Sequence, residues 1–325
     1  MPWSFPQRMA GSEQRRRLTA TGLQTMHMPS LPGGKILVTG ARGQLAQALA
    51  RHGSTRVQLV GRPDFDFDRP ETLDATLTAH NPSAVINAAA WTAVDLAESE
   101  QEAATRANTV GPVLLAQLCA QRRIPFLHIS TDYVFDGTKG TPYTETDLPS
   151  PCSAYGRSKA EGEKAILAVC PYGIILRTAW LYSASGSNFV KTILRAGATN
   201  PVIRVVDDQH GNPTSADDLA VVLLSILTHI EQHGWCSDYA GLYHASGHGA
   251  TTWYGLAVAA LESAAEQGQR LPQILAIRTE DWPTPARRPM DTRLDCTKLF
   301  RVFGLRLPAW EKSLRLVVPQ VLNAL

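Results

Sequence analysis

From residue 35 onward, the hydrophobic positions alternate between short continuous runs and longer stretches with helical spacing. The continuous runs are rich in Val, Ile and Leu, and they lie at 36–38, 57–60, 84–86, 126–129 and 173–176. The stretches with helical spacing lie at 44–52, 100–122 and 154–168. Short apolar runs are typical of strands buried on both faces, and strands that alternate with helices require crossover connections. The pattern therefore predicts an α/β fold with a Rossmann-like, doubly wound parallel sheet.

Beyond Arg177 the alternation becomes less regular. Proline, glycine and polar residues concentrate at 196–216 and 278–293, although 216–229 and 253–265 keep helical spacing. We predict a dinucleotide-binding Rossmann domain over 34–180. A smaller C-terminal substrate-binding lobe is predicted over 181–325, with some segments returning to the Rossmann domain, because ligands of open α/β sheets bind at the carboxyl ends of the strands.

The first 33 residues differ from the rest in composition. They hold a basic run at 15–17 and a single acid, Glu13, and no apolar segment of the kind a secretory signal needs follows the charges. The Arg-rich composition also suits a transit peptide. We predict instead that 1–33 are a disordered extension, or that the start codon is assigned too early.

Composition narrows the classes of partner. The chain has 31 basic and 29 acidic residues, a balance that argues against nucleic acid. No apolar run approaches the roughly 20 residues that a membrane span needs. The five cysteines are far apart and never form a CxxC pair, which predicts reduced thiols in a cytoplasmic protein without a zinc site. We therefore expect neither a nucleic-acid nor a membrane partner.

A glycine turn joins the first predicted strand to the first predicted helix. Gly40 permits a tight turn, Gly43 permits close approach of a pyrophosphate, and Ala46 permits close packing of the helix on the strand. The N–H groups that open the helix bind anions, so the turn residues Arg42, Gln44 and Leu45 are expected beside the cofactor. Such turns also occur without a ligand, but the strand–turn–helix context favours dinucleotide binding.

The end of the second strand bears on the choice of cofactor. An acid there would bind a ribose 2′-hydroxyl and repel a 2′-phosphate, but this chain has Gly61 and Arg62. The sequence therefore predicts NADP(H) as the preferred cofactor and NAD(H) as a possible one, since Asp64 lies close by. Asp66 and Phe67 are expected near the adenine, or else they end a surface turn.

Tyr155 and Lys159 stand four residues apart on a predicted helix, so both project from one face. A carbonyl reductase must protonate the oxygen as hydride arrives, and a phenol does this better when a cation stabilises its phenolate. Thr131 follows the fourth strand run and is placed to hydrogen-bond the same carbonyl. A surface Tyr and Lys, and a threonine satisfied by backbone, are the alternatives.

Taken together, these motifs resemble the extended short-chain dehydrogenase/reductase superfamily and, within it, the dTDP-4-dehydrorhamnose reductase family. The resemblance covers about residues 35 to 322, and its motifs lie at 40–46, 87–99, 130–135, 155–159, 177–182, 188–192, 208–214 and 283–289. It implies reduction of the C4 keto group of dTDP-4-dehydro-L-rhamnose to dTDP-L-rhamnose by NADPH or NADH. It also implies a nucleotide-sugar enzyme of polysaccharide biosynthesis.

The resemblance implies further roles. Trp180 would stack on the sugar ring, although a core aromatic is an equal alternative. Arg288 would hold the diphosphate, unless the adjacent Arg287 does so. The other residues implied at the cofactor are Asn87, Ala88, Ala89 and Thr92. The other residues implied at the substrate are Val94, Asp95, Thr131, Asp132, Tyr133, Asn188, Asn212, Thr214 and Trp253.

One departure from the family pattern and several alternatives remain. Some members form homodimers through a magnesium site made by glutamates. Here only Glu311 matches, and Ala48 occupies the other position, so we predict no metal and leave monomer or homodimer open. Dehydratases follow the threonine with Asp-Glu, whereas Tyr133 is a poor general base, which favours reduction. An epimerase or dehydratase, a UDP-linked keto-sugar, and a non-catalytic regulatory subunit on the same scaffold are the competing hypotheses.

Overall fold

The computed structural model describes residues 33–324, so nearly all of the predicted extension lies outside the described residues. Its centre is a six-stranded sheet in the order β10-β5-β4-β3-β1-β2, with every pairing parallel. The strands are β1 Ile36–Thr39, β2 Val57–Val60, β3 Ala84–Asn87, β4 Phe126–Thr131, β5 Gly173–Thr178 and β10 Gly241–His244. The predicted α/β class with a Rossmann-like parallel sheet is confirmed.

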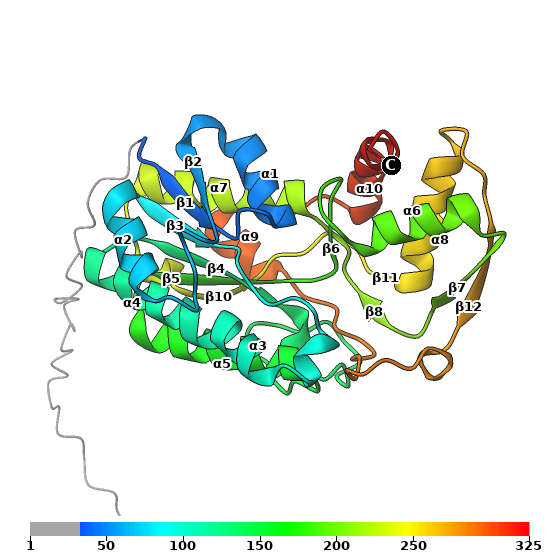
Figure 1. The fold of residues 1–325 in the computed structure, drawn as a ribbon, viewed down its shortest axis with the longest axis horizontal. Coiled ribbons are helices and arrows are strands. Elements are labelled where there is room, and N and C mark those ends of the chain that lie inside the picture. Colours follow the sequence, from blue (N-terminus) through cyan, green and yellow to red (C-terminus); the bar gives the residue numbers. More distant parts are fainter. Residues whose placement is uncertain (1–32, 325) are drawn as a thin grey trace, which may run out of the picture.

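Helices cover both faces of this sheet (Figure 1). One layer contains α1 Gln44–Gly53, α7 Ala216–His233 and α9 Thr297–Phe303, and the other contains α2 Glu71–His80, α4 Gly111–Arg122 and α5 Ala154–Val169. Ile36 and Val38 pack into the first layer, while Leu37 between them packs into the second. Because successive strand residues point to opposite faces and both faces are buried, the strands read as continuous apolar runs.

The stretch at 100–122, predicted as one helix, is interrupted. It comprises α3 Gln101–Thr105, a π-helical turn Arg106–Val110 (η3), and then α4. The interruption places the buried Asn108 so that its side chain accepts from Trp91 N at 2.8 Å and donates to Trp91 O and to Ser158 Oγ. One amide thus ties the loop after β3 to α5, which single-helix periodicity would not permit.

Three hydrophobic clusters make up most of the core of the molecule. The clusters described above surround the sheet, and another forms a second lobe, to the right in Figure 1, from α6 Phe189–Thr199, α8 Trp253–Ala265 and α10 Trp310–Leu322. Beside these helices β7 Val202–Val206 pairs in parallel with β12 Gln273–Ile277. The sequence pattern missed α6, β7 and β12, although Val190, Ile193 and Leu194 have helical spacing and both strands are mostly apolar.

The remaining elements are short connectors. Two small pairings, β6 Leu181–Tyr182 with β9 Thr214–Ser215 and β8 His210–Gly211 with β11 Thr251–Thr252, lie between the sheet and the second lobe. The single helical turns are η1 Ser54–Arg56, η2 Leu96–Glu98, η4 Asp132–Val134, η5 Ser237–Tyr239 and η6 Thr279–Asp281. Over residues 33–324, no helix is both long and apolar enough to cross a bilayer.

The chain crosses between the two halves several times. α7, β10 and α9 all follow residue 180, yet they pack on or extend the central sheet. The division at residue 180 stays a prediction; what the fold shows is that β10 is an edge strand of the main sheet.

A buried ion pair fixes α5 against the sheet. Arg177 on β5 donates to both carboxylate oxygens of Glu163 on α5, at 2.8 and 2.6 Å, with side chains only 1% and 4% exposed. Arg177 also lies over the ring of Phe135, 4.9 Å from its centroid. A bidentate pair has one preferred geometry, so it sets the position of the helix that carries Tyr155 and Lys159.

Candidate functional site

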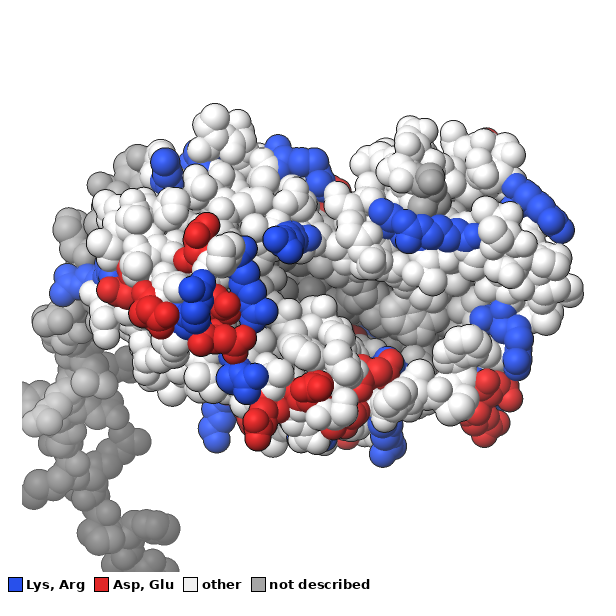
Figure 2. All heavy atoms as spheres, in the orientation of Figure 1, with Lys and Arg blue, Asp and Glu red and all other residues white. Residues whose placement is uncertain are grey.

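A cleft with a volume of about 1090 Å³ runs along the carboxyl ends of the strands and under the second lobe. Figure 2 shows the surface hollowed between the two halves of the molecule. Twenty of the predicted site residues line it: Gly40, Arg42, Gly43, Gln44, Leu45, Arg62, Asp66, Phe67, Ala88, Ala89, Thr92, Val94, Thr131, Asp132, Tyr133, Tyr155, Lys159, Trp180, Asn188 and Trp253. The structure thus brings residues from most of the predicted motifs to one cavity.

The glycine turn forms one end of the cleft. Gly40 has a φ of +78°, and a Cβ there would lie 2.9 Å from the backbone of Ala89. Gly43 precedes α1, and among the described residues no side chain caps the first N–H groups of this helix. Uncapped N–H groups at a helix N-terminus attract anions. The turn is therefore suited to a pyrophosphate.

The next stretch of the cleft wall is rich in charge. Arg62, whose side chain is 67% exposed, pairs with Asp66 at 2.9 Å and with Asp68 at 2.8 Å, and Asp68 also pairs with Arg106. Figure 2 shows basic and acidic side chains intermingled over the α2 and α3 end of the body. Arg62 is therefore not the free positive charge that the sequence suggested, because a bound phosphate would compete with two carboxylates for it.

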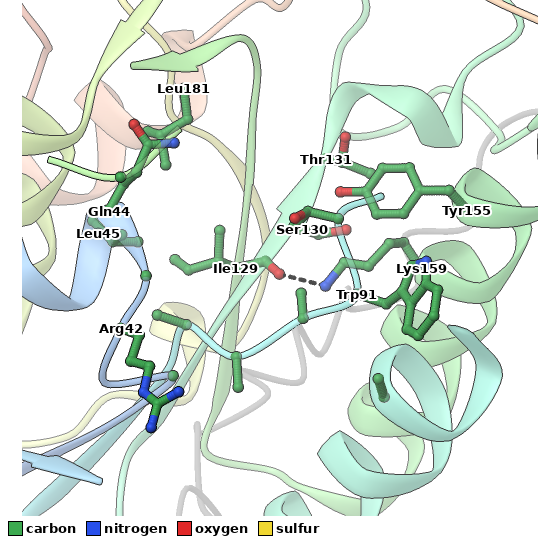
Figure 3. Close-up of a pocket in the computed structure, with 18 of the residues that line it drawn as sticks. Arg42, Gln44, Leu45, Trp91, Ile129, Ser130, Thr131, Tyr155, Lys159 and Leu181 are labelled. Atoms are coloured by element: carbon green, nitrogen blue, oxygen red, sulfur yellow. Dashed lines mark hydrogen bonds between the residues drawn. The ribbon is translucent and has the colours of Figure 1, made fainter. Parts of the chain in front are cut away.

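Thr131, Tyr155 and Lys159 meet at the middle of the cleft (Figure 3). Thr131 ends β4, and α5 presents the other two from its first turns. Ser153 Oγ accepts from Gly156 N at 3.1 Å and so begins this helix. A Cβ on Gly156 would lie 2.2 Å from Tyr133 O, so glycine lets α5 approach the end of β4.

Burial controls the ionisation of Tyr155 and Lys159. It raises the pKa of Tyr155 to about 12, and the hydrogen bond with Thr131 opposes this rise. It lowers the pKa of Lys159 to about 8, with the Glu163 carboxylate opposing. The Lys159 ammonium donates to Ile129 O at 2.7 Å. At neutral pH the phenol is therefore protonated and most of the Lys159 population is charged.

Asp132 and Tyr133 continue the wall beyond Thr131. Asp132 is buried and hydrogen-bonds with Thr131 and Thr292, and burial raises its pKa to about 6. Tyr133 lies edge-on to Tyr155, with ring centroids 5.8 Å apart. Burial also raises the pKa of the Tyr133 phenol. This wall therefore holds Thr131 in place and gives Tyr155 an aromatic neighbour.

Two tryptophans close the opposite side. Trp180 stacks on Trp253 with ring centroids 3.6 Å apart and planes 9° from parallel, and it has a φ of +45°. A Cβ on Gly211 would lie 2.5 Å from the Trp180 ring, so the glycine makes room for it. Trp253 Nε1 donates to Gln209 Oε1 at 3.1 Å. The stack presents a flat apolar surface to the cleft, of the kind that packs against a sugar ring.

Five predicted site residues lie outside the cleft wall, and their side chains hold segments together instead. Asn212 donates to Gly249 O and accepts from Leu294 N, and Thr214 bonds to Asn212 O and Gly247 N. Asn87 is buried beneath the cleft floor. These three side chains satisfy buried backbone or side-chain groups. The ligand-contact role that the resemblance implied for them stays a prediction.

Asp95 and Arg288 are the other two. They form an ion pair at 2.8 Å, and Asp95 also accepts from Ala286 N. Arg288 and Arg287 line a second cavity of about 300 Å³ on the far side of Tyr133, over whose ring Arg288 lies. Arg288 Nη2 therefore pairs with Asp95, whereas its buried Nη1 has no hydrogen-bond partner within residues 33–324. Neither arginine lines the main cleft.

The cleft also contains residues that the sequence did not single out. Trp91 lines it, with its indole N–H donating to Ala93 O. Ser130 and Thr178 line it as well, and their hydroxyls have no hydrogen-bond partner within residues 33–324. His128 lies beneath Lys159, at 3.1 Å from its Nζ. A histidine inside an otherwise apolar strand run was the available signal for His128. Ser130 and Thr178 lie within the motifs at 130–135 and 177–182, but the sequence assigned neither hydroxyl a role.

The fold and the site together define a class of protein. A parallel sheet with a glycine turn after β1, a Tyr-x-x-x-Lys pair on the helix before β5, and a long cleft under a second lobe are the features of extended short-chain dehydrogenases/reductases.

Comparison with known proteins identifies the family. The family described as "RmlD substrate binding domain" matches residues 34–323. A dTDP-4-dehydrorhamnose reductase of Sinorhizobium fredii is 43% identical over 87% of this chain and 96% of its own. That of Escherichia coli K12 is 38% identical over 86% of this chain and 95% of its own. The chain belongs to the dTDP-4-dehydrorhamnose reductase family, which makes it an oxidoreductase and confirms the resemblance.

Solved structures agree. A dTDP-4-dehydrorhamnose reductase from Clostridium acetobutylicum superposes with a TM-score of 0.81 at 35% identity, covering 90% of this chain and all of the other. One from Bacillus anthracis, in complex with NADP, has a TM-score of 0.80 at 30% identity, covering 88% and 99%.

Gly40→Ala tests the packing of the turn. Alanine at positive φ costs about 1–2 kcal/mol, and here its Cβ would also press on the Ala89 backbone. We expect a lower melting temperature in thermal unfolding than for the matched control Gly140→Ala, which has a similar φ of +73° and no atom within 4 Å of the added Cβ. Equal losses for the two variants would show that the Gly40–Ala89 contact contributes nothing.

Proposed function

We propose that the protein reduces the C4 keto group of dTDP-4-dehydro-L-rhamnose to give dTDP-L-rhamnose, with NADPH preferred over NADH. The observation that carries this proposal is the meeting of Thr131, Tyr155 and Lys159 in one cleft that also holds the glycine turn. The relatives named dTDP-4-dehydrorhamnose reductase support the substrate, and the NADP complex of the Bacillus anthracis protein supports the cofactor.

The residues present fit a nicotinamide dinucleotide. Gly40 and Gly43 leave space that a Cβ would fill, and the N-terminus of α1 opens into the cleft. The buried, unpartnered hydroxyls of Ser130 and Thr178 lie along its floor, where a polar ligand would satisfy them. When bound there, the reduced nicotinamide supplies the hydride.

Tyr155 is proposed as the proton donor. Its phenol is protonated at neutral pH, because the ordinary tyrosine pKa of about 10 already lies well above 7 and burial raises it further. It can therefore donate a hydrogen bond to the substrate carbonyl together with Thr131. As hydride reaches C4, the proton passes from Tyr155 Oη to the carbonyl oxygen. The Lys159 ammonium stabilises the phenolate that this leaves.

Other features of the wall favour reduction over dehydration. A dehydratase must also move protons at neighbouring carbons. Here Tyr133, whose pKa is raised by burial, occupies the position next to Asp132, and Asp132 is bonded to Thr131 and Thr292. A relative from Streptomyces antibioticus, 39% identical, is named a probable 4-ketoreductase of another dTDP-linked sugar. The names of these relatives support a dTDP-linked keto-sugar over the UDP-linked alternative.

The remaining parts of the proposal concern the setting. We place the enzyme in the cytoplasm, a placement that the five free cysteines support. Its partner is a small nucleotide sugar, and monomer and homodimer remain alternatives. Glu311 is exposed on α10 and Ala48 is fully buried, so the absence of a magnesium site at these positions stays our prediction.

The direct test supplies purified protein with dTDP-4-dehydro-L-rhamnose and follows NADPH and NADH oxidation, with the product identified by NMR. We expect dTDP-L-rhamnose, and faster turnover at low cofactor concentration with NADPH. A parallel reaction uses the UDP-linked keto-sugar. Higher kcat/KM on the UDP substrate would move the proposal to that nucleotide, and no oxidation with either would favour a regulatory subunit.

Tyr155→Phe should lower kcat by about 10²–10⁴, because it removes the donated proton and little else. NADPH binding, measured by fluorescence titration, should stay close to wild type. Tyr239→Phe is the matched control, since Tyr239 packs beside α7 and α9 away from the cleft. Near wild-type turnover in Tyr155→Phe would remove this residue from the mechanism.

Arg62→Ala should weaken NADPH binding by about 3- to 10-fold and NADH binding less. The effect is modest because Arg62 must leave Asp66 and Asp68 to meet a 2′-phosphate. Arg69→Ala serves as control, since Arg69 lies in the same charged cluster outside the cleft wall. Equal losses of both cofactors in Arg62→Ala would show that this arginine does not read the 2′-phosphate.

A further inference from the structure

Three polar side chains form a row across the sheet directly beneath the cleft. Thr39 of β1 is in register with Asn87 of β3, and Asn87 is in register with His128 of β4. All three are fully buried. The residues in register on either side, Val60 and Ile175, belong to the apolar cluster of the face covered by α2, α4 and α5. We call these three residues the polar row.

The polar row is connected by hydrogen bonds that end at Lys159. Thr39 Oγ1 donates to Asn87 Oδ1, the Asn87 amide nitrogen lies 2.9 Å from His128 Nδ1, and His128 Nε2 lies 3.1 Å from Lys159 Nζ. Lys159 Nζ also bonds to the backbone oxygen of Ile129. The row thus links the strand that precedes the glycine turn to the proposed catalytic lysine.

The backbone fixes the direction of this chain. Ala89 N–H points at Asn87 Oδ1 and at Thr39 Oγ1, at 3.3 and 3.2 Å, so the oxygen side of the amide faces the backbone donor. The NH₂ side of Asn87 therefore faces His128, whose Nδ1 must accept. A neutral imidazole carries one proton, and in this arrangement the proton is on Nε2, which faces Lys159.

This direction matters for the ionisation of Lys159. An imidazole N–H can bond to Nζ only if Nζ offers a lone pair, and an ammonium has none. Charging Lys159 therefore requires His128 to move its proton to Nδ1 and Asn87 to turn its amide. Burial and the charge of Lys159 hold the pKa of His128 well below its usual value, so the imidazole does not take up a second proton instead. The titratable groups around Lys159, on its own helix and on the strand packed against it, are Tyr155, Glu163 and His128. Behind them, Asp132 acts on Tyr155 and Arg177 pairs with Glu163.

Two of those groups are already committed elsewhere. Glu163 directs both carboxylate oxygens to Arg177, and Asp132 bonds to Thr131 and Thr292. His128 is the side chain in hydrogen-bond contact with Nζ. It is therefore the residue best placed to tune the amine.

We propose that His128 is a positioning residue for Lys159: the polar row favours the tautomer with the proton on Nε2, which opposes the charged amine, and His128 thereby sets the pH at which Lys159 gives up its proton. This inference rests on the function proposed above, in which the charged Lys159 supports proton donation by Tyr155. It implies that activity falls as pH rises through the titration of Lys159, and that His128 determines where that alkaline limit lies.

His128→Gln tests the proposal kinetically. A glutamine oxygen can accept from the ammonium, which favours the charged form, so the alkaline midpoint of kcat/KM should rise by about one pH unit. His244→Gln is the matched control, because His244 is an equally buried histidine of the same sheet, on β10, bonded to Tyr143 O. It should keep the wild-type midpoint. A lower kcat in His128→Gln with an unchanged midpoint would overturn the proposal and leave a purely structural role.

A second measurement needs neither activity nor a stable variant. In ¹⁵N-histidine-labelled wild-type protein without cofactor, the His128 ring should be neutral with its proton on Nε2 at pH 9. Its nitrogen signals should shift, with a midpoint near pH 8, as Lys159 becomes charged. An imidazolium at pH 7, or a proton on Nδ1 at pH 9, would overturn the inference. Failure of the wild-type protein to reduce any keto-sugar would instead count against the proposed function, while these signals would still decide the role of His128.

Discussion

The central constraint in this molecule is that both faces of the parallel sheet are covered by helices. A sheet buried in this way is accessible only at the ends of its strands, and in a parallel sheet all carboxyl ends lie at one edge. Gly40, Ala88, Thr131 and Ala179 each belong to or follow such an end, and all four line the cleft. The site depends on this edge, because segments far apart in the sequence meet only there.

The placement of α5 depends on a second set of interactions. The Glu163–Arg177 pair anchors its middle to β5, Asn108 in the π-helical turn bonds to Ser158, and Gly156 permits close contact with Tyr133. Each of these is buried and directional, so the helix has little freedom to slide or rotate. Burial also shifts the pKa values of Tyr155 and Lys159 in opposite directions, because it penalises the charged form of each group. The pKa of the phenol rises, since its charged form is the anion, and the pKa of the amine falls, since its charged form is the cation.

Electrostatics differ along the cleft. At the outer end, Arg62 is shared among carboxylates in an exposed cluster, where ion pairs contribute little and exchange partners readily. At the inner end, Lys159 is buried against an imidazole and a carbonyl, where a single proton changes the hydrogen-bonding of a whole row. We therefore expect Arg62 to give only a moderate preference between NADPH and NADH. At the inner end, the hydrogen-bonding arrangement around Lys159 is set by discrete protonation steps.

The sequence by itself determined the features that are encoded locally. Continuous apolar runs identified five of the six sheet strands. The sequence also predicted a dinucleotide site and proton-transfer chemistry, from the glycine turn, Thr131 and the Tyr155–Lys159 spacing. Both predictions were possible because hydrophobic period and turn chemistry are properties of neighbouring residues. Only the tertiary structure decided that Gly241–His244 joins the sheet, that a π-helical turn interrupts residues 100–122, and that Asn212, Thr214 and Arg288 bond to protein. It also decided that Thr39, Asn87 and His128 stand side by side. Most of these outcomes depend on strand register or on partners distant in the sequence, and no local pattern carries that information.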